Sequence, residues 1–147
     1  MAAHIQKRYD LALERIRDND YEGAIGFLED NIKYGGPTPA SLSLLGALIA
    51  KSGGNLKKAE KLCKEALKLD SGNAECYLNL AEVYIKRKWH SKLIKTLRAG
   101  IETDPENEEI VKLLNQFSTR KKPPIPFLSR SNALNKYLGK LMANYRL

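Results

Sequence analysis

The 147-residue sequence has few of the residues that build covalent, metal and catalytic sites. It contains two cysteines, Cys63 and Cys76, and two histidines, His4 and His90. Two cysteines make no disulfide framework, and neither has a second Cys or a His at metal-ligand spacing. The sequence therefore indicates no metal, no cofactor and no disulfide scaffold, and the reducing cytoplasm is the expected location.

Long apolar runs are missing as well. The longest apolar stretch, residues 44–50, is far shorter than the roughly 20 residues that span a bilayer. Residues 1–8 lack the apolar core of a signal peptide, so neither a transmembrane segment nor secretion is expected. Leu, Ala, Lys and Glu dominate while β-branched residues are sparse, and this composition favours helices.

Two segments of the chain repeat each other. The sequence Leu-Asp-Ser-Gly-Asn at 69–73 corresponds to Thr-Asp-Pro-Glu-Asn at 103–107, and the two lie 34 residues apart. Ahead of the second, apolar residues recur at helical spacing in two stripes, Tyr77, Leu80, Ala81 and Tyr84, then Leu93, Ile94, Leu97 and Ile101. This spacing predicts a pair of helices that pack against each other. Gly100 is expected to permit close approach of the next helix.

This pattern resembles the tetratricopeptide repeat family, whose unit has the same period. Residues 74–107 match its pattern at Tyr77, Leu80-Ala81, Tyr84, Leu93, Leu97, Gly100 and Pro105. Residues 39–73 match at Leu42, Leu45-Gly46, Ile49, Ala59, Cys63 and Ala66, with Ser71 in place of Pro. A more divergent unit covers 5–38, where Arg8 and Arg15 stand in place of aromatics. The resemblance implies an all-α solenoid of antiparallel helix hairpins.

The breaks between these units predict the domain organisation. Turn residues occupy 18–20, 51–55 and 87–90 within hairpins, and 35–39, 71–73 and 104–107 between them. A repeat domain is expected over 1–118, with units at 5–38, 39–73 and 74–107 and a capping helix at 108–118. Residues 119–147 form a proline-containing linker and a C-terminal amphipathic helix in this interpretation.

The C-terminal segment departs from the repeat. Prolines in 120–128 predict an extended linker. The apolar stripe that follows is the expected docking or self-association surface: Leu134, Tyr137, Leu138, Leu141, Met142 and Tyr145. A helix this short needs a surface to pack on. Three surfaces stay open: the chain's own solenoid, a second copy in a homodimer, and a membrane or foreign partner.

In the tetratricopeptide family, the first helix of each hairpin lines a concave groove that accepts a peptide or a helix. Carried across by position, the resemblance implies these groove residues: Tyr9, Leu13, Ile16, Arg17, Ser43, Ala47, Ala50, Lys51, Leu78, Asn79, Glu82, Ile85 and Lys86. The small residues in the middle are expected to form a shallow floor over which a helix can lie closely.

The groove residues suggest which ligand fits. The family members that hold chaperone C-termini use Lys, Arg and Asn side chains that are not matched here, and Glu75 and Glu82 would repel an acidic tail. Arg17, Lys51 and Lys86 occupy equivalent positions, so they predict a basic ladder along one rim. The expected partner is therefore a protein or peptide segment, amphipathic or extended, with acidic flanks.

Other functions are weighed against this one. Catalysis lacks a partnered nucleophile or base, since Cys63 falls at a core position and His90 in a turn. The net charge is +8, and residues 108–147 carry eight basic and two acidic residues, so an adaptor that binds RNA or an anionic membrane is the alternative. Nucleic acid is disfavoured because the lysines of residues 57–68 also read as a solvated helix face. Trp89 is either an exposed anchor or packed on its turn.

Overall fold

The computed structural model describes residues 2–118 together with Ala133, Lys136 and Lys140. It divides the chain into two compact units, Met1–Phe117 and Ser118–Leu147. The described part of the first unit contains helices and no strand, in the order α1 (Ala2–Arg17), α2 (Tyr21–Gly35), α3 (Pro39–Lys51), α4 (Leu56–Leu69), α5 (Ala74–Arg87), α6 (His90–Thr103) and α7 (Glu108–Ser118). The all-α expectation is confirmed for these residues.

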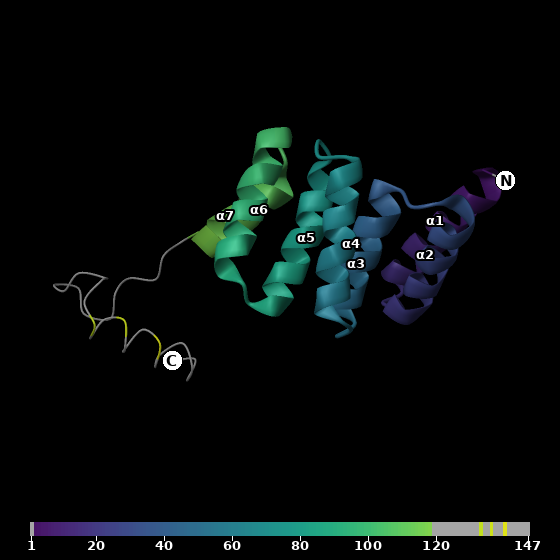
Figure 1. Cartoon of the computed structure of the whole chain (residues 1–147), viewed down its shortest axis with the longest axis horizontal. Coiled ribbons are helices and arrows are strands. Elements are labelled where there is room, and N and C mark those ends of the chain that lie inside the picture. Colours follow the sequence, from purple (N-terminus) through teal and green to yellow (C-terminus); the bar gives the residue numbers. More distant parts are fainter. Residues whose placement is uncertain (1, 119–132, 134–135, 137–139, 141–147) are drawn as a thin grey trace. The chain divides into compact units, whose positions relative to one another are not determined.

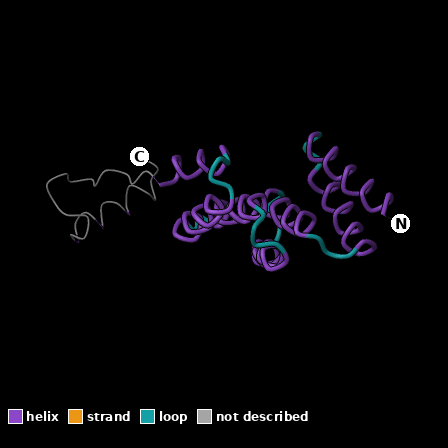
Figure 2. Tube along the Cα trace, turned by 90° about the horizontal axis from the view of Figure 1, so that it is seen from above, coloured by secondary structure: helices purple, strands orange, loops and turns teal. Residues whose placement is uncertain are grey.

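Consecutive helices pair and stack in chain order. Helices α1 and α2, α3 and α4, and α5 and α6 pack as hairpins, and α3 also packs against α2 and α5. Figure 1 shows the pairs following one another from purple to green, and Figure 2 shows from above the short loops that connect them. Since each hairpin packs against the next one along the chain, the first unit is an α-solenoid.

Local signals fix the helix ends. The side chains of Asp20, Asn55 and Asn73 accept hydrogen bonds from the first backbone N–H groups of α2, α4 and α5. Thr38 and Ser41 form a reciprocal capping box at the start of α3, where Pro39 occupies the first turn. The turn residues that the sequence singles out therefore lie between helices.

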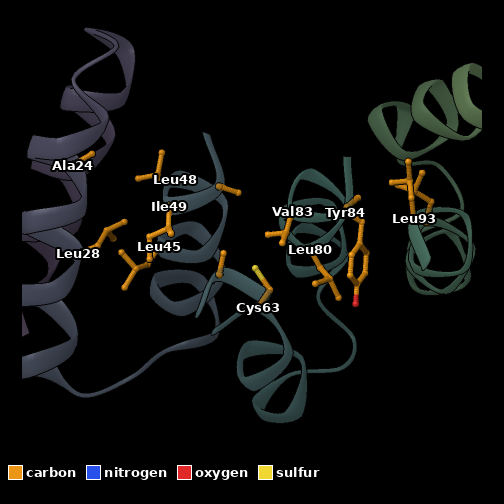
Figure 3. Packing of buried hydrophobic residues seen from close by; sticks show 14 of the residues in the cluster. Ala24, Leu28, Leu45, Leu48, Ile49, Cys63, Leu80, Val83, Tyr84 and Leu93 are labelled. Atoms are coloured by element: carbon orange, nitrogen blue, oxygen red, sulfur yellow. The ribbon is translucent and has the colours of Figure 1, made fainter. Parts of the chain in front are cut away.

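The core follows the seams between helices. Buried apolar side chains from α1 to α7 form one continuous cluster, and Figure 3 shows a large part of it. Leu28, Leu48, Leu93, Leu97 and Ile110 are its largest fully buried members. Each helix contributes the apolar stripe that its sequence predicts, so burial of these stripes drives the stacking.

Two glycines set how closely the helices approach. A Cβ on Gly46 would lie 2.5 Å from Cys63 Sγ and 2.8 Å from the Ala59 carbonyl oxygen, so the close approach of α3 and α4 at this point requires a glycine. A Cβ on Gly100 would lie 2.9 Å from Ile110 Cδ1 and from Tyr77 Cβ. The close approach expected at Gly100 is confirmed, and it involves both α5 and α7.

The divergent first pair uses cations where the repeat has aromatics. The Arg8 guanidinium carbon lies 4.7 Å from the ring centroid of Tyr34, and that of Arg15 lies 5.9 Å from the ring of Phe27. Arg15 also bonds Asp20 in the following turn at 3.2 Å. The two arginines thus pack against aromatic rings of α2 instead of supplying aromatic side chains themselves.

Among the described residues, no helix combines the length and hydropathy that crossing a bilayer requires. In the second unit, Lys136 and Lys140 are helical and exposed, as expected for the polar face of the predicted C-terminal helix. The apolar stripe from Leu134 to Tyr145, by contrast, lies outside the described residues. Its docking role stays a prediction.

Candidate functional site

A cleft of about 130 Å³ opens between the end of α3, one face of α5 and the face of α7 turned towards it. Its lining consists of Lys51, Glu75, Leu78, Asn79, Glu82, Glu109 and Leu113. The four α5 residues share one helix face because they are spaced by three or four positions. The opposite face of α5 carries the buried Leu80, Val83 and Tyr84. The cleft thus forms because α5 is amphipathic and because α7 contributes two residues to the same lining.

Carboxylates dominate the cleft. Glu75, Glu82 and Glu109 face a single ammonium group, that of Lys51. Among the described residues, none of these three carboxylates takes part in a salt bridge. Leu78 and Leu113 supply apolar contact area and Asn79 a side-chain amide. The arrangement can therefore bind a segment that presents an apolar side chain and a cation.

Four of the predicted groove residues line this cleft, namely Lys51, Leu78, Asn79 and Glu82. The small residues of α3 do not. Ser43, Ala47 and Ala50 are between 1% and 3% exposed, so they present no floor to a ligand. This expectation is wrong because small side chains let α5 pack closely on α3, where Asn79 Nδ2 donates to Ser43 Oγ at 3.1 Å.

The remaining predicted residues are not part of the lining of the cleft. Tyr9, Ile16 and Ile85 are half-buried against the core cluster, and Leu13 is also half-buried. Burial raises the pKa of Tyr9, and the negative charge of Glu75 raises it further. The hydroxyl group of Tyr9, on α1, is therefore close enough to Glu75, in the first turn of α5, to interact with its charge. Arg17 and Lys86 are exposed.

Two lining residues, Glu109 and Leu113, come from α7, which sequence reasoning treats only as a cap. Their place in the cleft could have been predicted, because a capping helix brings polar as well as apolar residues next to the preceding hairpin. Ile110 is fully buried, and it turns Glu109 and Leu113, one position before and three after it, towards the flanks of α7. The cap therefore completes the cleft.

The residues considered for catalysis have structural roles. Cys63 is fully buried, its Sγ donates to the Ser43 carbonyl at 3.5 Å, and burial raises the pKa of its thiol to about 12. Such a thiol is not a nucleophile at neutral pH. His90 Nε2 lies 2.7 Å from the Phe117 carbonyl oxygen, which joins the start of α6 to the end of α7.

Comparison with known proteins agrees with this geometry. A family model described as tetratricopeptide repeat matches residues 50–117. No curated protein sequence matches the chain.

Solved structures resemble the fold. The Arabidopsis OM64 TPR domain superposes with a TM-score of 0.71 at 14% identity, over 81% of this chain and 98% of that domain. An O-GlcNAc transferase mutant from Thermobaculum terrenum gives 0.72 at 26% identity, over 77% of this chain but 22% of the transferase. The first TPR of Spaghetti (RPAP3), bound to the HSP90 peptide SRMEEVD, gives 0.70 at 15% identity, over 78% and 92%. With its helix pairs, its 34-residue period and this family match, the segment at residues 50–117 belongs to the tetratricopeptide repeat family.

Proposed function

We propose that this chain is a non-catalytic module that binds a segment of another polypeptide in the cleft between α3, α5 and α7. The observation that carries the proposal is the cleft itself, in which apolar, amide and charged side chains from three helices converge. A structural neighbour that binds a peptide supports the same class of function. Stacked hairpins offer one continuous surface to an extended or helical ligand.

The cleft also bears on the charge of the ligand. Arg17, Lys51 and Lys86 predict a ligand with acidic flanks, and all three side chains are exposed. Within the cleft, however, Lys51 stands against three carboxylates. We therefore propose a ligand whose central part carries a basic side chain beside an apolar one. Acidic residues belong only to its flanks, outside the cleft.

The same carboxylates argue against an acidic chaperone tail. The peptide bound to Spaghetti, SRMEEVD, carries two glutamates and an aspartate among its last four residues. Glu75, Glu82 and Glu109 would repel such a terminus in this cleft. The fold is shared with that neighbour, but the charge in the cleft favours a ligand of the opposite sign.

Peptide selection tests the proposal. A library of displayed peptides is selected on the full chain and on Glu82→Lys, with Glu102→Lys as the matched control, because Glu102 is exposed on α6 away from the cleft. We expect peptides with a central Lys or Arg beside an apolar residue. Binding of these peptides should fall about tenfold in Glu82→Lys and stay unchanged in Glu102→Lys. Selection of acidic centres, or equal loss in both variants, would contradict the proposal.

Self-association through the predicted C-terminal helix is a separate proposal. Sedimentation of the full chain and of Leu138→Asp with Leu141→Asp compares their masses in solution. A dimer that becomes a monomer in the variant is the expected result, since an ionised residue in an apolar seam is costly. A monomer in both cases would exclude this role for the stripe.

A further inference from the structure

A second polar surface lies on α4 and at the start of α6. Lys57, Lys61, Lys64 and Lys68 form one stripe of α4, opposite the buried Ala59, Cys63 and Ala66, and we call these four residues the lysine strip. A shallow hollow of about 400 Å³ runs along the strip and includes Glu60 and Glu65 in its lining. The strip spans about 16 Å of helix, with a lysine every 5–6 Å or so.

A second hollow lies at the turn between α5 and α6. It measures about 480 Å³ and is lined by Trp89, His90, Ser91 and Lys92. The side chain of Trp89 is 39% exposed, although its ring also stacks on Tyr84 with centroids 6.2 Å apart. Trp89 is thus exposed and at the same time stacked on Tyr84 of α5, and its role as an anchor stays a prediction.

Glu60 connects the two hollows. It is 8% exposed and accepts a hydrogen bond from the Tyr84 hydroxyl at 3.1 Å and another from Arg87. Its Oε1 atom also lies 2.7 Å from Lys64 Nζ and 3.6 Å from Lys92 Nζ. Because Lys64 belongs to the strip and Lys92 to the Trp89 hollow, a shared carboxylate oxygen makes them one continuous surface.

Glu60 does not oppose an anion on this surface. Burial alone would raise the pKa of Glu60, but the hydrogen bonds from Lys64 and Tyr84 and the charges of Lys64 and Lys92 outweigh it and lower the pKa. The carboxylate is therefore ionised at neutral pH and is engaged by its neighbours. Lys57 and Lys68 are exposed and make no salt bridge among the described residues. Lys61 is also exposed, with Glu65 3.9 Å from its ammonium group.

Cations also hold the Trp89 ring in place. The guanidinium carbon of Arg87 lies 3.6 Å from the ring centroid, and Lys92 Nζ lies 4.0 Å from it. The side chain of Arg87 is only 19% exposed and is fixed by Glu60. The Trp89 ring is thus ordered beside a hollow and next to a row of cations, and the exposed side chain of Lys92 must move aside before a base can stack on the ring.

We infer that this surface binds a single-stranded nucleic acid, with the phosphate backbone along the lysine strip and one base against Trp89. A linear row of cations next to an exposed aromatic ring is the combination that non-specific single-strand binding uses. An acidic peptide would use the lysines but not the ring. A flat membrane would meet two recesses and one exposed aromatic. The lysines alone would be interpreted as a solvent-exposed helix face. Because Glu60 connects them to the exposed Trp89, we interpret them instead as part of a binding surface.

The fluorescence of Trp89 tests the inference, because Trp89 is the single tryptophan of the chain. The full-length protein is titrated with an oligothymidylate of about 10 nucleotides. Polyglutamate and phosphatidylserine vesicles are titrated in parallel. We expect the oligonucleotide to quench the fluorescence, with an affinity that falls as salt rises, by a log–log slope of about −0.7 for each phosphate contacted.

Variants locate the binding. Lys61→Gln with Lys68→Gln should reduce the salt slope by about 1.4, whereas the matched control Lys7→Gln with Lys33→Gln should leave it unchanged. In Trp89→Leu, binding is followed by the anisotropy of a labelled oligonucleotide, and affinity should fall at least about tenfold through lost stacking. Trp89→Phe should retain most of it.

Three results would overturn the inference. The first is an unquenched Trp89 at saturating oligonucleotide. The second is equal loss of binding in the strip variant and its control. The third is loss only when the basic C-terminal segment is changed, by Arg120→Gln with Lys121→Gln and Lys122→Gln. Preference for polyglutamate or for the vesicles over the oligonucleotide would likewise assign the surface to another partner.

Discussion

Helices α4 and α5 are consecutive and pack against each other, yet their solvent faces have opposite charges. Outward positions of α4 carry the lysine strip, whereas those of α5 carry Glu75 and Glu82 in the cleft. The buried positions of both helices are those that the repeat pattern specifies, for the second helix of one unit in α4 and for the first helix of the next unit in α5. The repeat thus constrains the seams between helices and leaves the charge of each solvent face free to vary.

The seams themselves show how much freedom the repeat allows. In the first of the two repeats, Gly46 meets Cys63 across the seam between α3 and α4. The equivalent positions in the next repeat are Ala81 and Leu97, which are both buried. A missing side chain on one helix and a small one on the other thus replace two larger ones, so packing is kept by different residues.

The largest effect should come from breaking the seam that supports both surfaces. Gly46→Val places methyl groups where Cys63 Sγ and the Ala59 carbonyl already lie, so we expect a loss of about 3 kcal/mol in the free energy of unfolding, or failure to fold. Urea unfolding measures it. The control Gly26→Ala meets nothing within 4 Å and should stabilise the chain by up to about 1 kcal/mol.

A smaller loss of stability is expected when only the surface of the lysine strip and Trp89 is disrupted. Glu60→Ala leaves Arg87 and the Tyr84 hydroxyl without their acceptor, so we expect a loss of about 2 kcal/mol in the free energy of unfolding. The emission of Trp89 should also shift, because Arg87 and Lys92 lose the group that positions them. Unchanged emission would show that the ring is held by other contacts.

The pH dependence of Glu60 sharpens that result. Its folded-state pKa lies below the ordinary value of 4.5, so its ionisation contributes stability above that pH. The contribution is lost as the pH falls through the folded pKa. The difference in unfolding free energy between the natural chain and Glu60→Gln should therefore shrink below about pH 4.5. A difference that grows towards acid pH would contradict this role.

A still smaller loss of stability is expected from a substitution that affects binding in the cleft more than binding at the lysine strip. In Gly100→Ala the added methyl group crowds Ile110 and Tyr77, so α7 must shift. We expect a loss of about 1 kcal/mol in stability and weaker binding of cleft peptides, because Glu109 and Leu113 belong to α7. Binding of the oligonucleotide at Trp89 should change less. If both ligands weaken equally, the two surfaces are not independent.

The smallest effect should come from the strip itself. The variant Lys57→Gln, Lys61→Gln and Lys68→Gln removes three exposed cations, whose one salt bridge joins Lys61 to Glu65 at 3.9 Å. Exposed pairs of this kind contribute little, so the free energy of unfolding should change by less than about 0.5 kcal/mol. A thermal melt beside the binding titration measures both quantities on one sample.

Much of the fold was predictable because its determinants are local. The stripe of Tyr77, Leu80 and Tyr84 extends over about two turns of helix, and the caps at Asn55 and Asn73 act within one turn. Four of the seven residues that line the cleft were equally predictable, since Lys51, Leu78, Asn79 and Glu82 follow from their positions in the repeat. These residues need only the helix period to be placed.

The rest depends on how far apart the helices lie, which no local pattern states. Ala47 and Ala50 are small enough for either a groove floor or a tight seam, and only the approach of α5 decides that they are buried. The contact of Glu60 with Tyr84 joins residues 24 positions apart on helices of different repeats. Such pairings are set by inter-helix distance and rotation, not by propensity.

The two buried thiols have one more consequence. Cys63 and Cys76 are both fully buried in the middle of the stack, and each donates to a backbone carbonyl, of Ser43 and Pro39 respectively. An alkylating reagent can reach them only when the central hairpin opens, while fraying at either end leaves them protected. The alkylation rates of the two cysteines therefore measure how often the central hairpin opens, and no label has to be introduced into the chain for this measurement.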